Sequence, residues 1–297
     1  MKTYFPELSS YNDINFKKNY NKISSKLKLL AYPCLLSKSY LSGNPEYWDQ
    51  NINQKLTLRD FLNLIRIPRI LLSYISIIIY FFISSIRNKK IAFLLTRAAG
   101  IHSSKSLDDF RFDGLSKELN KKNIMTIYYI FDNSKLKNPI NLQPKLFHRD
   151  VIILAKLQNI FELVSQKIIR KNFFKEKLWE KDLELVIKSS RIISKFTKFS
   201  SYSFFWDFNY QNYPFFLGSY LSKNKLIGSM HAFHNSKHMP WMSSDCVKNT
   251  GIKHFFNDYK SINDFSKKDN KAKIKNIKKV KSKKIDLKKI SDLVIIQ

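Results

Sequence analysis

Glycine and cysteine are scarce in this sequence of 297 residues, and their scarcity excludes several classes of protein. The six glycines are too far apart to form a G-x-G-x-x-G turn, a phosphate-binding P-loop or a G-x-S-x-G nucleophile elbow. Those motifs need glycine because their backbone must approach a phosphate closely or turn sharply. The two cysteines, Cys34 and Cys246, cannot form a four-thiolate zinc site or a CxxC redox pair. P-loop NTPases, standard dinucleotide-binding enzymes and nucleophile-elbow hydrolases are therefore excluded.

Acidic residues are also few relative to basic ones. The chain has 53 Lys and Arg against 23 Asp and Glu, which gives a formal net charge of +30. Such a charge favours anionic partners such as phosphates, anionic lipid headgroups or acidic glycans. About half of residues 267–289 are lysine, a composition typical of a solvated segment or a nucleic-acid-binding arm. We therefore treat residues 261–297 as a separate lysine-rich C-terminal segment.

One long apolar run, Ile70–Ile86, contains no charged residue and is bounded by Arg66 and Arg69 before it and Arg87 after it. At about 1.5 Å per residue it would only just cross a hydrocarbon layer of about 30 Å. We therefore favour a buried or interface-lying helix, with a single transmembrane helix as the alternative. The first ten residues lack the apolar run of a signal peptide, so we expect a cytoplasmic protein.

Short apolar runs alternate with helical patterns after the long apolar run. We expect strands at 91–96, 124–130, 202–207 and 225–231, and helices at 112–119, within 150–200 and at 213–223. Strands that alternate with helices indicate βαβ units, and hence a parallel sheet with its functional loops at the carboxyl ends of the strands. The prediction is an α/β fold: a parallel sheet with flanking helices in residues 89–260, preceded by a mostly helical region over residues 1–88.

Polar residues follow several of these predicted strands. Arg97 follows the first strand, Arg111 opens the next helix, and Asp207 ends another strand. His231 and His234 follow the strand at 225–231, and histidine suits proton transfer or phosphate contact near neutral pH. We expect an anion site and an acid/base site here, and no metal. The alternatives are that the histidines lie in an ordinary loop and that the charged residues cap helices or pair locally.

Two segments resemble a known family. Residues 91–130, with Arg111-Phe-Asp-Gly-Leu-Ser-Lys-Glu-Leu119 in the middle, resemble the first βαβ unit of bacterial surface-carbohydrate biosynthesis proteins of the GT-B glycosyltransferase type. Leu226–Ala232 is similar to the strand end of their N-terminal Rossmann-like domain, with Met230 in place of Gln and Ala232 in place of Gly. The resemblance implies a Rossmann-like sheet, with Gly228 in the strand and His231 at the interdomain cleft.

The resemblance also implies a function. A glycosyltransferase-like protein of surface polysaccharide (capsule or lipopolysaccharide) biosynthesis would take a nucleotide-sugar as donor, hold no tightly bound cofactor, and use an anionic glycan or lipid-linked acceptor. His231 and Asp207 would be catalytic, and Arg97, Arg111, His234 and Gly228 would bind the acceptor or an anion. It would work at the inner face of the membrane, as a peripheral protein on an anionic surface.

The second nucleotide-binding domain of that architecture has no counterpart here, because only about sixty residues follow His238. The implied protein is either a truncated transferase or one whose partner subunit supplies the donor domain, and whether it is an enzyme by itself stays open. Two alternatives belong to other classes. One is a basic nucleic-acid-binding protein, disfavoured because no recognisable nucleic-acid motif is present, and the other is a non-enzymatic membrane-associated protein.

Overall fold

The structure is a computed structural model in which part of the chain is described. The described residues are 18–19, 22–42, 46–52, 58, 62–97, 107–109, 114–131, 143–169, 176–206, 210–230 and 253–256. The statements below concern these residues. Of the sequence predictions, the lysine-rich segment 261–297 lies entirely outside them.

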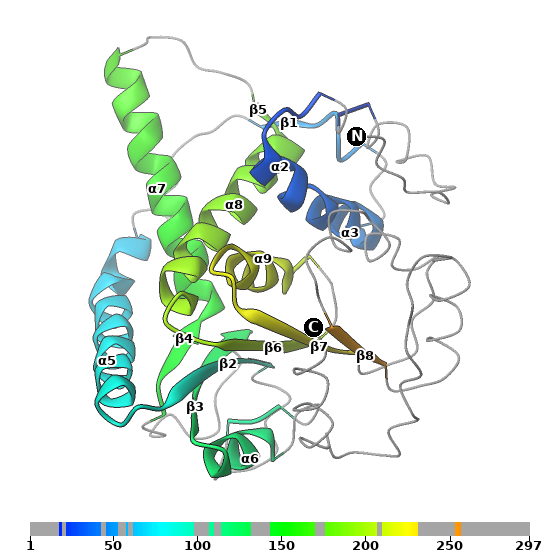
Figure 1. The fold of residues 1–297 in the computed structure, drawn as a ribbon. Helices are drawn as coiled ribbons and strands as arrows, with labels where there is room; N and C mark the ends of the chain where they lie inside the picture. Colours follow the sequence, from blue (N-terminus) through cyan, green and yellow to red (C-terminus); the bar gives the residue numbers. More distant parts are fainter. Residues whose placement is uncertain are drawn as a thin grey trace.

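The centre of the fold is a parallel sheet of six strands, which confirms the predicted α/β class (Figure 1). All neighbouring strands in it pair in parallel. In spatial order the strands are β4 (Lys145–Phe147), β3 (Ile124–Phe131), β2 (Lys90–Arg97), β6 (Tyr202–Trp206), β7 (Lys225–Met230) and β8 (Lys253–Phe256). Residues 91–96 and 125–130 of the two longest strands are buried throughout, as expected for central strands covered on both faces.

Helices cover both faces of the sheet. Helices α7 (His148–Ile169), α8 (Leu178–Thr197) and α9 (Tyr213–Leu221) lie on one face, and α6 (Leu115–Lys121) lies on the other (Figure 1). The two predicted strand–helix–strand units are therefore β2-α6-β3 and β6-α9-β7. Helices α8 and α9 approach each other closely at Gly218, where an added Cβ would lie 2.7 Å from the Cβ of Ile193. Only glycine fits at this contact between the two helices.

The described part of the N-terminal region is mostly helical, as predicted. Helices α2 (Lys26–Ala31) and α3 (Pro33–Ser42) pack on α8, and α2 also contacts α9. A short antiparallel ribbon of β1 (Asn51–Ile52) and β5 (Glu176–Lys177) joins the region to the start of α8. The rings of Tyr32, Trp48 and Trp179 contact one another: Tyr32 lies 5.7 Å from each tryptophan ring, and the two tryptophan rings are 6.4 Å apart. These rings belong to the same hydrophobic core as the central strands.

Helix α5 (Ile67–Ile86) confirms the predicted helix over the apolar run. It follows the 3-10 turn η1 (Asn63–Arg66) and carries Pro68 in its first turn, where the missing N–H leaves no helical hydrogen bond unmade. It packs beside the edge strand β4. The segment Asn63–Ile86 is long and apolar enough to cross a bilayer, by length and composition only.

Candidate functional site

The candidate site is the carboxyl edge of the sheet between β2 and β6. Numbered along the chain within the sheet, the strand order is 3-2-1-4-5-6, so the direction of strand addition reverses between β2 and β6. In open α/β sheets, ligands bind outside the carboxyl ends of the strands at such a reversal, because the following loops diverge there and leave a crevice. The strand order alone therefore predicts a ligand site at this edge.

Arg97 lies at this edge. It is the last residue of β2, and its side chain is exposed. Its backbone N–H donates a hydrogen bond of 3.0 Å to Oδ2 of Asp109, which fixes the backbone at the strand end. A guanidinium group at the reversal point gives the edge a cation suited to phosphate or carboxylate.

The other predicted site residues are continuous with the neighbouring strand ends. Asp207 directly follows β6 and His231 directly follows β7, and these two strands pair through Phe205 with Gly228. Gly228 lies inside β7, where it also pairs with His254 of β8. The strands β2, β6 and β7 are neighbours and parallel, so the chain leaves all three at one edge. Arg111, Asp207, His231 and His234 themselves lie outside the described residues.

Two aspartates that the sequence analysis missed organise the loop after β2. Asp108 and Asp109 are buried, and the carboxylate of Asp108 accepts hydrogen bonds from three donors. These are the backbone N–H of Ser116 at 3.1 Å, the Ser116 hydroxyl at 2.7 Å and the Tyr128 hydroxyl at 2.8 Å. Ser116 lies in the first turn of α6, so the anion at this helix start is the chain's own Asp108. The loop is thereby tied to both the helix and β3.

A second pair missed by the sequence analysis lies at the end of β4. His148 follows β4 directly, and its Nδ1 lies 2.7 Å from the hydroxyl of Tyr129. Burial lowers the pKa of His148 to about 4, and burial raises the pKa of Tyr129 well above its usual value. At neutral pH the imidazole is therefore uncharged, and its Nδ1 shares a hydrogen bond with the tyrosine hydroxyl. The ring of Phe215 packs against Tyr129 at 4.8 Å, so this pair supports the packing of α9 on the sheet.

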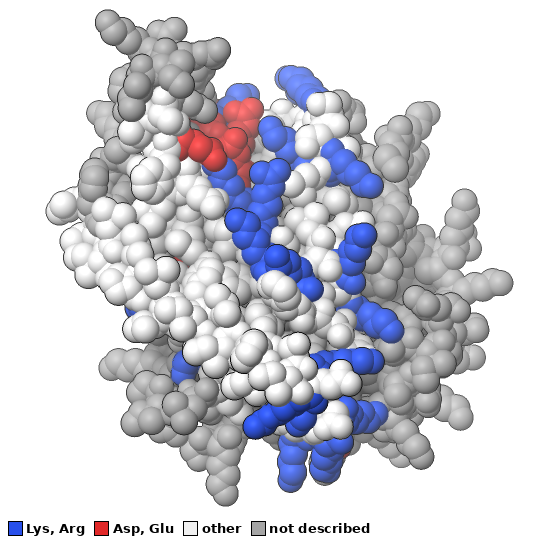
Figure 2. All heavy atoms as spheres, turned by 60° about the vertical axis from the view of Figure 1, so that its left-hand side comes forward, with Lys and Arg blue, Asp and Glu red and all other residues white. Residues whose placement is uncertain are grey.

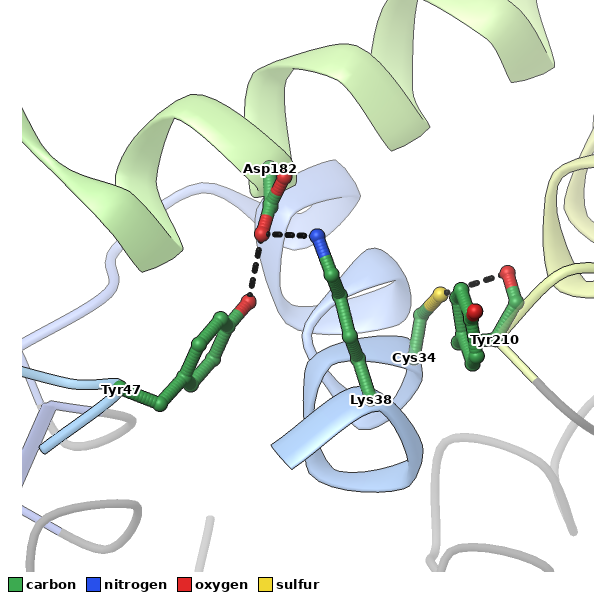
Figure 3. A network of polar contacts seen from close by, with 5 residues as sticks. All are labelled: Cys34, Lys38, Tyr47, Asp182 and Tyr210. Atoms are coloured by element: carbon green, nitrogen blue, oxygen red, sulfur yellow. Dashed lines mark hydrogen bonds and ion pairs between the residues drawn. The ribbon is translucent and has the colours of Figure 1, made fainter. Parts of the chain in front are cut away.

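The N-terminal helices are held against α8 and against Tyr210, which precedes α9. Figure 3 shows Asp182 of α8 accepting hydrogen bonds from Lys38 Nζ at 2.5 Å and from the Tyr47 hydroxyl at 2.8 Å. In the same view the Cys34 thiol of α3 donates to the backbone oxygen of Tyr210 at 3.3 Å, in the segment between β6 and α9. Burial raises the pKa of the Cys34 thiol, so it stays protonated as a hydrogen-bond donor.

Two further features of the described residues bear on where a ligand would bind. Within these residues, no three His, Cys, Asp or Glu side chains come together as metal ligands. A hollow between α7 and α8, lined by Phe161, Glu162, Arg191 and Lys195 among others, lies on the helical layer and away from the carboxyl edge. Because Glu162 pairs with Lys188, Arg191 and Lys195 leave the lining of the hollow positively charged.

The fold and this edge together define a doubly wound, Rossmann-like α/β protein. No family model, curated protein or solved structure matches the chain.

Proposed function

We propose that this chain is a glycosyltransferase-like protein of bacterial surface polysaccharide biosynthesis. The observation that supports the proposal most strongly is the strand order, because it brings Arg97 and the carboxyl ends of β6 and β7, which Asp207 and His231 follow in the sequence, to one edge of a parallel sheet. An edge of this kind is where Rossmann-like proteins bind phosphorylated ligands. The donor in this proposal is a nucleotide-sugar, which binds as a substrate and not as a tightly held cofactor.

The proposed roles follow from the chemistry of sugar transfer. A bond forms between an acceptor hydroxyl oxygen and the anomeric carbon, while the bond from that carbon to the donor's diphosphate breaks. The hydroxyl proton needs a base, and the leaving diphosphate needs cations. We assign the base or acid/base role to His231 and Asp207, and contact with the anionic groups to Arg97, Arg111 and His234. Gly228, three residues before His231, has no side chain and lets a ligand approach the backbone of β7.

The acceptor in this proposal is a lipid-linked or anionic glycan at the cytoplasmic face of the membrane. The net charge of +30 favours both such an acceptor and an anionic membrane surface. A partner subunit would supply the second Rossmann-like domain, and the cations of this chain would still contact the diphosphate of the donor.

A complementation experiment tests the proposal. The gene is deleted in its own organism and restored as the wild type, as His231→Ala, as Asp207→Asn or as Lys117→Gln, and surface polysaccharide is measured at matched protein levels. Lys117 is the control because it is an exposed cation on α6. We expect the deletion, His231→Ala and Asp207→Asn to lose the polysaccharide, and Lys117→Gln to retain it.

Unchanged polysaccharide in the deletion strain would overturn the assignment to this pathway. Unchanged polysaccharide in both site variants, with loss only in the deletion, would remove His231 and Asp207 from the mechanism. Nucleic acid that copurifies with the wild-type protein and is released by salt would instead favour the nucleic-acid-binding alternative.

A further inference from the structure

Helix α5 has two apolar faces, and only one of them is covered by protein. The covered face consists of residues spaced by three or four along the helix: Ile70, Tyr74, Ile77, Phe81 and Ser84. Ile70, Ile77 and Ser84 are buried, and the Tyr74 and Phe81 rings contact Phe196 and Phe199. This spacing is the one by which a helix packs along a single seam against its neighbours.

The opposite face of α5 is an exposed apolar stripe. Seven large apolar side chains on it are between 52% and 69% exposed: Leu71, Leu72, Ile75, Ile78, Ile79, Phe82 and Ile86. At 100° per residue they occupy one continuous sector of the helix, opposite the covered seam. Water-soluble proteins rarely expose a contiguous apolar surface of this kind unless it meets a membrane or another protein.

The contacts of α5 with the rest of the protein decide how it would meet a membrane. Near its start, Arg69 donates to the buried carboxylate of Asp150 at 2.5 Å, and its guanidinium lies over the Phe147 ring at 5.4 Å. Near its end, the Phe81 ring lies 5.0 Å from that of Phe199. A helix that crossed a bilayer would break these contacts and leave the Asp150 carboxylate buried without its cation, which is unfavourable. The helix therefore stays on the protein and can meet lipid only along its exposed stripe.

The charges around the stripe are of one sign. No Asp or Glu occurs in residues 61–107, which include the whole helix and the strand after it. Arg87 and Lys90 follow the helix and are exposed, and Lys198 is exposed next to Phe199, whose side chain is itself 58% exposed. Figure 2 brings the α5 side of the molecule forward and shows a broad uncharged surface bordered by a band of Lys and Arg, with the acidic residues gathered near the top of the view.

We infer that the exposed stripe of α5 docks the protein on an anionic phospholipid bilayer, with the helix axis in the plane of the membrane and Arg87, Lys90 and Lys198 on the lipid headgroups. An apolar face with a basic rim is the arrangement that binds this interface. The charge disfavours a second copy of the chain as the partner, because two copies would bring identical cations together. The inference does not rest on the proposed transferase activity.

Flotation with vesicles tests the docking. The full chain is mixed with vesicles of phosphatidylcholine alone or of phosphatidylcholine with phosphatidylglycerol, at low and high salt. We compare the wild type with Ile75→Gln/Ile79→Gln, with Arg87→Gln/Lys90→Gln, and with the matched control Ser76→Gln/Ser85→Gln. Ser76 and Ser85 are exposed on the same helix but outside the stripe.

We expect the wild type and the serine control to float with anionic vesicles and to be partly released by salt. The double isoleucine variant should bind about a hundredfold more weakly, since two partly inserted isoleucines lose their burial. The double cation variant should lose the preference for anionic lipid. Equal binding by the wild type and the isoleucine variant would overturn the inference. The inference would also be overturned if the wild type did not bind vesicles and instead formed a dimer, and if the isoleucine substitutions dissociated that dimer.

A depth measurement separates a helix that lies in the interface from one that spans. One cysteine is added at position 72, 79 or 86 in a Cys246→Ser background, in which the other remaining cysteine is the buried Cys34. The added cysteine carries an environment-sensitive fluorophore, and lipids with nitroxides at different acyl depths quench it. These positions are seven residues apart and face the same way on the helix. An in-plane helix gives the same shallow depth at all three. A helix that spans the bilayer over Asn63–Ile86 would place positions 72 and 79 deep and position 86 shallow, and that result would contradict the inference.

Discussion

Replacing Gly218 by alanine should destabilise the protein, although alanine is the better helix former. An alanine Cβ at this position of α9 would lie 2.7 Å from Cβ and 2.8 Å from Cγ2 of Ile193, and 2.8 Å from the backbone oxygen of Ser190. Two of these atoms, the Ile193 Cβ and the Ser190 oxygen, are fixed to the backbone of α8. Rotation of a side chain therefore cannot relieve the contact, and the two helices must move apart.

The magnitude follows from two opposing terms. Overpacking of a close-packed contact costs about 1 to 3 kcal/mol, and three contacts of this closeness place Gly218→Ala at the upper end. Alanine in a helix interior stabilises the helix by about 1 kcal/mol relative to glycine. We therefore expect the free energy of unfolding to fall by about 2 kcal/mol.

The matched control is Ser219→Ala on the same helix. Ser219 is fully buried, and its hydroxyl makes no hydrogen bond within the described part of the chain. Its removal should therefore leave stability unchanged or raise it slightly. Urea unfolding followed by circular dichroism measures both variants. A Gly218→Ala protein as stable as the wild type would refute the close approach of α8 and α9.

Three further predictions concern charged and polar groups. The pKa of His148 is about 4 in the folded protein, below its usual 6.5, so the unfolded chain takes up a proton first as the pH falls. Stability should therefore decrease as the pH drops from about 6.5 to about 4. In urea unfolding at several pH values, His148→Gln should reduce this decrease. Burial, and then the charges of Glu184 and Glu180, raise the pKa of Glu176 from 4.5 to about 7. Stability should therefore decrease as the pH rises through that range. In thermal melts above about pH 7, Glu176→Gln should be more stable than the wild type. Asp182→Ala should lower the free energy of unfolding by about 1 to 3 kcal/mol, because Lys38 loses its partner. Limited proteolysis should then cut the N-terminal helices faster in Asp182→Ala than in the control Lys188→Gln. Equal cutting rates would show that Asp182 does not hold these helices.

The central strands were predictable because each is a continuous apolar run. Residues 91–96 and 125–130 are buried on both faces of the sheet, and this burial is what a run without alternation indicates. The edge strands β4 and β8 have only three and four residues, Lys-Leu-Phe and Lys-His-Phe-Phe, so they leave no comparable run in the sequence. The strand order was not predictable either, because it depends on where α7 and α8 return the chain to the sheet.

The candidate site was predictable only as far as the strand ends. Arg97 follows a run of buried residues, and the structure places it at the carboxyl edge as expected. The anchors around it were hidden, because Asp108 meets Tyr128 across twenty residues and no local pattern marks that contact. Likewise, the apolar run of α5 was visible in the sequence, but only its contacts reveal which face is covered and which is exposed.

A nucleotide titration tests the central claim most directly. Isothermal titration calorimetry with uridine diphosphate and guanosine diphosphate compares the wild type, Arg97→Gln and Lys225→Gln. Arg97 ends β2 at the carboxyl edge, and the exposed Lys225 begins β7 at the opposite edge, so the two variants remove one positive charge each from opposite ends of the sheet. If the carboxyl edge at the strand reversal is the anion-binding site, at least one of the nucleotides binds, Arg97→Gln weakens binding about tenfold or more, and Lys225→Gln leaves it unchanged. Binding that weakens equally in both variants, or that never depends on Arg97, would contradict the account.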